Sequence, residues 1–246
     1  MNTAFLQEVF SSVQGEGVYL GVRQIFIRFQ RCNLACIYCD TNEATGKLNE
    51  NFRVEIVPGS GDFQWLSNPV TPRQLLDLVE TMSAERHHSL SLTGGEPLLY
   101  KEFLLEFLKL FHGTCPVFLE TNGTRWEDLK ELIPLIDIVS MDFKLPSATG
   151  LSSWDRHGKF LKIAKEKEVY VKIVLTSKTE REEIDQAVKL IQKIDNGIPL
   201  ILQPVTPVKK AKGISPRDVI SIQDYCSRHL KNVRVIPQMH KTFQLL

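Results

Sequence analysis

Short apolar runs rich in β-branched residues alternate along this chain with amphipathic stretches, in which apolar positions recur every three or four residues. Runs of the first kind predict buried strands, and stretches of the second kind predict helices that cover them. Strands are expected at residues 24–30, 89–93, 117–121, 136–142, 169–175, 199–203 and 233–236. Helices are expected between them at residues 72–83, 101–111, 126–135, 153–166, 179–194 and 215–230. Such alternation predicts right-handed crossovers and a parallel sheet.

The number of strand–helix units limits the architecture. About six units are too few for a closed eight-fold barrel. The predicted fold class is therefore α/β, a partial, open parallel β/α barrel formed by a single domain over residues 1–246. Residues 43–68 break the alternation with a Pro-Gly-Ser-Gly run and an Asn-Pro pair. We interpret them as an insertion, either a short hairpin or lid, or a disordered linker.

Composition narrows the class of protein. With 246 residues and 43% hydrophobic positions, the chain is long enough to bury a full core. A net charge of +1 gives no reason to expect nucleic acid or an anionic membrane as a partner. No apolar run reaches the roughly 20 residues of a membrane span, and the first residues lack a signal-peptide pattern. Five cysteines, three of them clustered, argue against a disulfide framework and favour a reducing cytoplasm.

Cys32, Cys36 and Cys39 form a C-x3-C-x2-C run with Tyr38 just before the last cysteine. Three thiolates leave an iron–sulfur cluster one protein ligand short, so one iron can bind a small molecule. A zinc site and three unrelated buried thiols are the alternatives. Zinc usually recruits a second close pair of ligands, and Cys115 and Cys226 each stand alone.

Polar segments follow several of the predicted strands. They are Thr-Gly-Gly-Glu-Pro at 93–97, Glu-Thr-Asn-Gly at 120–123, Ser-Met-Asp-Phe-Lys at 140–144 and Gln-Pro-Val-Thr at 203–206. In parallel α/β folds, ligands bind at the carboxyl ends of the strands. Paired glycines let a backbone approach a ligand closely, and a glutamate can hold an ammonium group. Tight turns and a structural Asp–Lys pair are the alternative interpretations of these segments.

The cysteine run and the Gly-Gly-Glu-Pro segment together resemble the radical S-adenosylmethionine (SAM) superfamily. The resemblance implies a four-iron four-sulfur (4Fe-4S) cluster on the three cysteines, whose free iron is chelated by SAM. An electron from the cluster then cleaves SAM and leaves a 5′-deoxyadenosyl radical. The resemblance further implies contacts to SAM from Tyr38, Gly95, Glu96, Asn122, Ser140, Asp142, Lys144, Gln203, Pro204, Val205 and Thr206.

Four further features of the sequence indicate one family within this superfamily. Gln-Gly-Glu-Gly at 14–17 can surround a heterocycle, and Arg28 in an apolar strand needs an anionic partner, which is either a ligand or a nearby glutamate. Asp40 and Thr41 follow the last cysteine and offer oxygen ligands for Mg²⁺, or else an Asx-type turn. The chain ends with a Gln-Met-His-Lys segment at 238–241. Together these resemble the family of 7-carboxy-7-deazaguanine synthases, across nearly the whole chain.

That family implies conversion of 6-carboxy-5,6,7,8-tetrahydropterin to 7-carboxy-7-deazaguanine, with hydrogen abstraction at C6, ring contraction and loss of ammonia, in queuosine and 7-deazapurine biosynthesis. The resemblance also implies that SAM is regenerated, and that Thr41 and the adjacent Asp40 bind Mg²⁺. An electron donor such as flavodoxin and a homodimer are expected. The substrate contacts that the resemblance implies are Val13, Gln14, Gly15, Glu16, Arg28, Thr93 and Leu246.

Two segments depart from that family. Residues 140–144 are longer than the Ser-Pro-Lys that the family often has, and the terminal segment reads Gln-Met-His-Lys-Thr in place of Gln-Thr-His-Lys-Tyr. Two alternatives stay open. A glycyl-radical-enzyme activase shares the cysteine spacing and a Met-Asp-x-Lys segment, but needs no grip on a pterin. A regulatory iron–sulfur or zinc protein without turnover has no need of a second ligand segment.

Overall fold

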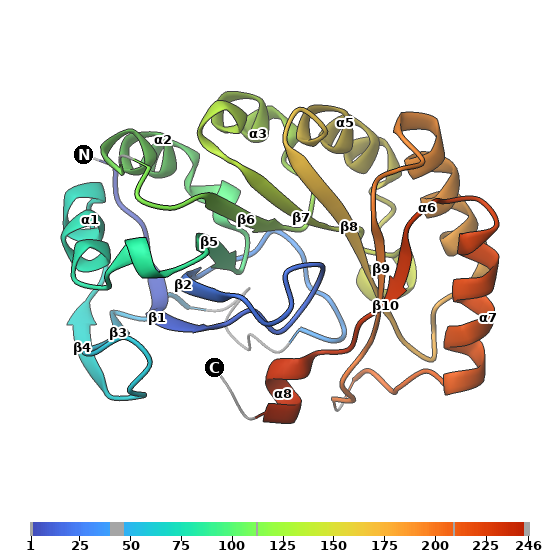
Figure 1. Cartoon of the computed structure of the whole chain (residues 1–246), viewed down its shortest axis with the longest axis horizontal. Coiled ribbons are helices and arrows are strands. Elements are labelled where there is room, and N and C mark those ends of the chain that lie inside the picture. Colours follow the sequence, from blue (N-terminus) through green and yellow to red (C-terminus); the bar gives the residue numbers. More distant parts are fainter. Residues whose placement is uncertain (1, 40–46, 112, 209, 244–246) are drawn as a thin grey trace.

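The computed structural model describes residues 2–39, 47–111, 113–208 and 210–243. The strands within these residues form one open sheet, in the order β10-β9-β8-β7-β6-β5-β2-β1-β3-β4. Because β10 and β4 stand at its two ends, the sheet does not close into a barrel (Figure 1). The parallel part consists of β2 (Arg23–Phe29), β5 (Ser89–Gly94), β6 (Val117–Thr121), β7 (Ile138–Asp142), β8 (Glu168–Leu175), β9 (Leu200–Pro204) and β10 (Val233–Val235).

A helix follows each of the first six of these strands, which confirms the predicted partial barrel. Figure 1 shows these helices as an arc around the outer face of the sheet. They are α1 (Pro72–Glu80), α2 (Lys101–Leu110), α3 (Trp126–Leu132), α5 (Trp154–Ala164), α6 (Arg181–Ile194) and α7 (Pro216–Ser227). Shorter elements are η1 (Ala84–Arg86), η2 (Pro97–Tyr100), η3 (Ile133–Leu135), α4 (Pro146–Thr149) and α8 (Met239–Phe243), which lies on the opposite side of the sheet from the arc.

The helices form where their apolar spacing and their caps predict. In α6, the buried residues Ile184, Ala187, Val188 and Ile191 recur every three or four positions and face the sheet. Thr71 closes a capping box at the start of α1, and the Ser215 side chain accepts a hydrogen bond from Asp218 N at the start of α7. No helix in the described part of the chain is long and apolar enough to cross a membrane.

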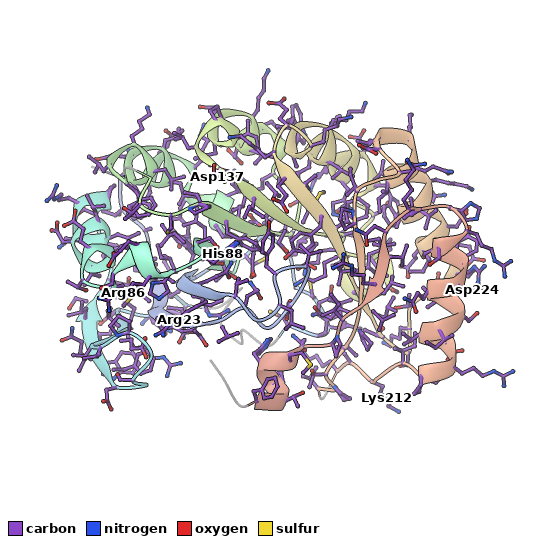
Figure 2. All side chains as sticks on the ribbon, in the orientation of Figure 1. Arg23, Arg86, His88, Asp137, Lys212 and Asp224 are labelled. Carbon is purple, nitrogen blue, oxygen red and sulfur yellow. The ribbon has the colours of Figure 1, made fainter. Side chains whose placement is uncertain are left out.

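The amino-terminal edge of the sheet differs from the expected start at residues 24–30. A strand that the sequence did not reveal, β1 (Leu6–Val13), pairs antiparallel with β2. The described part of the expected insertion forms a hairpin of β3 (Asn51–Glu55) and β4 (Phe63–Ser67), and β3 pairs parallel with β1. Arg23, labelled in Figure 2 between β2 and this hairpin, donates hydrogen bonds to Ser11 Oγ and to the Pro58 carbonyl. The hairpin is therefore an extension of the sheet.

Candidate active site

The inner face of the sheet changes from apolar to polar along the strands. Near the amino ends, Phe118, Ile138, Tyr170 and Ile201 form a small buried cluster that closes the bottom of the partial barrel. Side chains alternate along a strand, so the next inward positions on the same strands are Glu120, Ser140, Lys172 and Gln203. The strands therefore place their polar residues together at the carboxyl end, where parallel α/β folds bind ligands.

A cavity of about 570 Å³ opens at this end. Its wall includes sixteen of the predicted site residues: Val13, Gln14, Gly15, Glu16, Arg28, Cys32, Cys36, Tyr38, Cys39, Thr93, Gly95, Asn122, Asp142, Lys144, Gln203 and Val205. Four others, Glu96, Ser140, Pro204 and Thr206, are described but do not line it. The predictions for Asp40, Thr41 and Leu246 concern residues outside the described ranges.

The three clustered cysteines border the cavity as free thiols. Burial raises the pKa of Cys32 to about 11 and also raises that of Cys36, so both are protonated at neutral pH until a metal displaces the proton. Within the described ranges, no three His, Cys, Asp or Glu side chains are grouped closely enough to hold one metal ion. Three thiols are one ligand short of closing a 4Fe-4S cluster, so they fit a cluster in which one iron is open to a small molecule.

Charged side chains form a network on the wall contributed by β7 and β8. Lys172 forms a short ion pair with Glu16 and lies 3.6 Å from Asp142 Oδ2, which Lys144 Nζ contacts at 2.9 Å. Burial alone would raise the pKa of Glu16, but the charge of Lys172 and hydrogen bonds from Lys172 and Gln238 lower it to about 2. Glu16 is therefore an ionised acceptor at neutral pH, held beside a buried ammonium group.

Gln14, Thr93 and Glu120 are joined by hydrogen bonds on the adjacent part of the wall. Gln14 Nε2 donates to Glu120 Oε1 at 2.8 Å, and Thr93 Oγ1 donates to Glu120 Oε2 at 2.6 Å. Gln14 Oε1 accepts from the Glu16 backbone N–H at 3.0 Å. Sequence reasoning named Gln14, Thr93 and Glu16 but not Glu120 or Lys172 as site residues. Their inward strand positions were the signal that could have identified them.

Arg28 pairs with a nearby glutamate, as one of its two interpretations predicted, and its contact with a ligand stays a prediction. Its Nε lies 2.7 Å from Glu8 Oε1, and its side chain also lines the cavity. The other oxygen of Glu8 is 2.5 Å from Arg53, which also borders the cavity and comes from the hairpin. Two guanidinium groups thus share one carboxylate, which leaves a net positive charge on this wall. Sequence reasoning missed Arg53 because residues 43–68 showed no chemical motif.

Glu96 lies behind the cavity wall, where burial raises its pKa to about 7. Its carboxylate accepts hydrogen bonds from Leu98 N, Thr121 Oγ1 and Asn122 N. These contacts attach the Gly-Gly-Glu-Pro segment to the end of β6. A Cβ on Gly95 would lie 1.6 Å from the Arg31 carbonyl oxygen, so this glycine allows close approach to the cysteine loop. In this structure the segment supports the site, and the predicted contact of Glu96 with the SAM amino group stays a prediction.

The carboxyl-terminal segment packs onto the Gln-Gly-Glu-Gly turn. Met239 N donates to the Gly15 carbonyl at 2.9 Å, and Gln238 Nε2 donates to Glu16 Oε1 at 2.8 Å. A Cβ on Gly15 would come within 2.4 Å of His240 Nδ1, so only glycine fits there. Gln238 and His240 line the cavity, so the carboxyl-terminal segment and the Gln-Gly-Glu-Gly turn share one wall.

Known proteins are similar to this chain in sequence and in architecture. The family model described as Radical SAM superfamily matches residues 26–191. The 7-carboxy-7-deazaguanine synthase of Geobacter sulfurreducens is 44% identical, covering 97% of this chain and 96% of that protein. The chain belongs to the 7-carboxy-7-deazaguanine synthase family of radical SAM enzymes. The synthase of Methanocaldococcus jannaschii is 34% identical, covering 98% of this chain and 100% of the relative.

Solved structures show the same fold. The crystal structure of QueE from Escherichia coli has a TM-score of 0.61 at 21% identity, covering 95% of this chain and 93% of that one. A radical SAM methyltransferase from Sphaerobacter thermophilus has a TM-score of 0.58 at 10% identity, with 94% and 77% covered. The family implies a 4Fe-4S cluster and SAM. Cys32, Cys36 and Cys39 stay the predicted ligands of that cluster.

Proposed function

We propose that this chain converts 6-carboxy-5,6,7,8-tetrahydropterin to 7-carboxy-7-deazaguanine with loss of ammonia, in queuosine and 7-deazapurine biosynthesis. One observation carries the proposal. One cavity is lined both by the three cysteines and by amide, carboxylate and guanidinium groups suited to a carboxylated heterocycle. When bound, the cluster and SAM supply the means of abstracting the hydrogen at C6.

The residues of this chain would bind and orient the substrate. Gln14 offers its Oε1 as an acceptor, because its Nε2 donates to Gln24 and Glu120. Glu16 is an ionised acceptor for N–H groups of the pterin ring. Thr93 and Glu120 form the adjoining part of the same wall. Arg28 would bind the substrate carboxylate, with its guanidinium held by Glu8. The positive wall and the ionised Glu16 together fix which end of the substrate faces which side of the cavity.

The remaining predicted roles belong to this proposal. Tyr38, Gly95, Asp142, Lys144, Gln203 and Val205 line the same cavity as the cysteines and suit a nucleoside and an amino acid. Thr41 and Asp40 would supply oxygen ligands to Mg²⁺, and Leu246 would approach the substrate. A small redox protein such as flavodoxin would supply the electron, within a reducing cytoplasm. A homodimer is expected, and light scattering with size-exclusion chromatography tests it.

The test is anaerobic turnover with reconstituted cluster, SAM, reductant, Mg²⁺ and 6-carboxytetrahydropterin, followed by mass spectrometry. We expect 7-carboxy-7-deazaguanine from the wild type and none from Cys36→Ala. Cys115→Ala is the matched control, because Cys115 is buried away from the cavity and should retain turnover. Cleavage of SAM to 5′-deoxyadenosine without this product would reject the substrate while keeping the enzyme class. The activase and the non-catalytic regulator are not favoured by any observation on this cavity.

Arg28→Ala tests the binding of the substrate carboxylate. Hydrogen bonds to charged groups contribute about 1.5–3 kcal/mol, so KM should rise roughly 10- to 100-fold. The absorption spectrum of the reconstituted cluster should not change, because Arg28 contacts Glu8 and not the cysteines. A KM within twofold of the wild-type value would remove Arg28 from the substrate site.

A further inference from the structure

A closed ring of hydrogen bonds lies beside Cys32. Asn122 Nδ2 donates to Asn33 Oδ1 at 2.8 Å, and Asn33 Nδ2 donates to Thr124 Oγ1 at 2.9 Å. Thr124 Oγ1 donates to Asn122 Oδ1 at 2.6 Å, which completes the ring. Asn122 Nδ2 also faces Cys32 Sγ at 3.7 Å, a distance suited to an N–H···S hydrogen bond. The Leu34 backbone N–H is a second donor to the same sulfur.

The ring fixes which end of the Asn122 amide faces the sulfur. The Thr124 backbone N–H can only donate, and it donates to Asn122 Oδ1 at 3.1 Å. That atom must therefore be the oxygen, and the opposite atom, next to Cys32, must be the nitrogen. Both hydrogens of the amide have acceptors in this arrangement, one on Asn33 and one on Cys32.

The backbone of Asn122 is held as firmly as its side chain. Its N–H donates to Glu96 Oε2 at 2.8 Å, and its carbonyl is 3.2 Å from His157 Nε2. His157 is fully buried and stacks on Phe143 with ring centroids 4.8 Å apart, so it anchors the carbonyl from the far side. Asn122 itself is 4% exposed. Its amide therefore cannot turn away from Cys32 without breaking several buried hydrogen bonds.

We propose that the Asn122 side chain is a hydrogen-bond donor to the cluster thiolate of Cys32 and raises the reduction potential of the cluster. Reduction adds negative charge to the cluster and its sulfurs, so a donor stabilises the reduced form more than the oxidised form. Asn33 and Thr124 are positioning residues, because they act by orienting the Asn122 amide. The proposal rests on the cluster of the radical SAM family and is independent of the substrate proposed above.

The experiment is an EPR-monitored redox titration of the reconstituted protein without SAM or substrate. Asn122→Asp keeps the size of the side chain and its acceptor for Thr124, but removes the donor to Cys32. We expect the ratio of reduced to oxidised cluster at the wild-type midpoint to fall about tenfold, which is a shift of about 59 mV for one electron. Asn33→Asp is the matched control. It adds the same charge beside the same ligand, keeps an acceptor for Asn122, and should shift the midpoint less.

A neutral variant and a wild-type measurement complete the test. Asn122→Ala should also lower the midpoint, with no added charge, at unchanged iron and sulfide content. An unshifted midpoint in this variant, or equal shifts in the two aspartate variants, would overturn the proposal. If the variants do not retain the cluster, the hydrogen bond is tested in wild-type protein labelled with ¹⁵N in its asparagine side-chain amides. Pulsed EPR of its reduced cluster should show a ¹⁵N coupling, and the absence of one would equally overturn the proposal.

Discussion

Lys172 is the residue whose removal tests the electrostatics of the cavity most directly. Its side chain is only 7% exposed and contacts the carboxylates of Glu16 and Asp142. Against the effect of burial, Lys172 contributes to lowering the pKa of Glu16 from 4.5 to about 2. At about 1.36 kcal/mol per pH unit, that difference corresponds to about 3 kcal/mol in favour of the ionised carboxylate in the folded chain.

In Lys172→Met, Glu16 would stay buried without its cation, whereas Asp142 would keep Lys144. Removing one partner of a buried ion pair costs about 3–5 kcal/mol, so we expect the free energy of unfolding at pH 7 to fall by that amount. The assay is urea denaturation followed by tryptophan fluorescence. Lys159→Met is the matched control, because it removes an exposed ammonium paired with Asp155 and should cost less than about 1 kcal/mol.

The difference between wild type and Lys172→Met should depend on pH in one direction. The pKa of Glu16 is lower in the folded than in the unfolded chain. Its stabilisation is therefore complete above about pH 4.5 and is lost as pH falls toward about 2. The advantage of the wild type should shrink as pH falls through this window. Equal urea midpoints at pH 7, or an advantage that stays constant below pH 4.5, would refute the reasoning.

Two other substitutions test the cavity wall and its support. Arg53→Gln should raise the KM for a carboxylated substrate several-fold with little change in kcat. Arg73→Gln, at an exposed pair with Asp77, is the control and should leave KM unchanged. Equal KM values for the two variants would contradict a role of Arg53 in substrate binding. Glu96→Gln should lower the free energy of unfolding at pH 6 by about 1–3 kcal/mol, because its amide nitrogen meets a backbone N–H that needs an acceptor. Burial raises the pKa of Glu96 to about 7, so its contribution to wild-type stability falls as pH rises from 4.5 to 7. Thermal unfolding across that pH range measures this dependence. Parallel stability profiles for wild type and Glu96→Gln would contradict the raised pKa of Glu96.

The strand–helix alternation predicted most of the fold, because parallel strands buried on both faces have a strong apolar signal. The strand at β6 begins and ends as expected, and most others differ by one or two residues. The sequence did not reveal β1, whose polar positions Glu8, Ser11 and Ser12 interrupt its apolar pattern. Glu8 and Ser11 are nevertheless buried, since each has a partner on a neighbouring strand or segment. Polar residues that are satisfied only by long-range contacts carry no local signal.

The site was predictable to the extent that motifs mark it. The cysteine run and the Gln-Gly-Glu-Gly segment contain several informative residues within a short stretch, and both border the cavity. Glu96 shows where this reasoning fails. A motif identifies a conserved arrangement of residue types, but it does not say whether a carboxylate faces a ligand or faces the backbone behind it. Here three protein donors occupy the Glu96 carboxylate, and Asn122 bonds to Cys32 and Asn33.

Arg53 shows why an apparent insertion can belong to the site. In the sheet, β1 lies between β2 and β3, and Glu8 is the direct cross-strand partner of both Arg28 and Arg53. Side chains paired in this way emerge on one face and can interact, although 45 residues separate Glu8 from Arg53 in the sequence. If only one arginine flanked Glu8, the two opposite charges would nearly cancel. With two, the wall keeps a positive charge toward the cavity. We therefore expect binding of an anionic substrate to depend on the pairing of β3 with β1. A change that releases the hairpin should weaken substrate binding even though the cysteines lie elsewhere on the cavity wall.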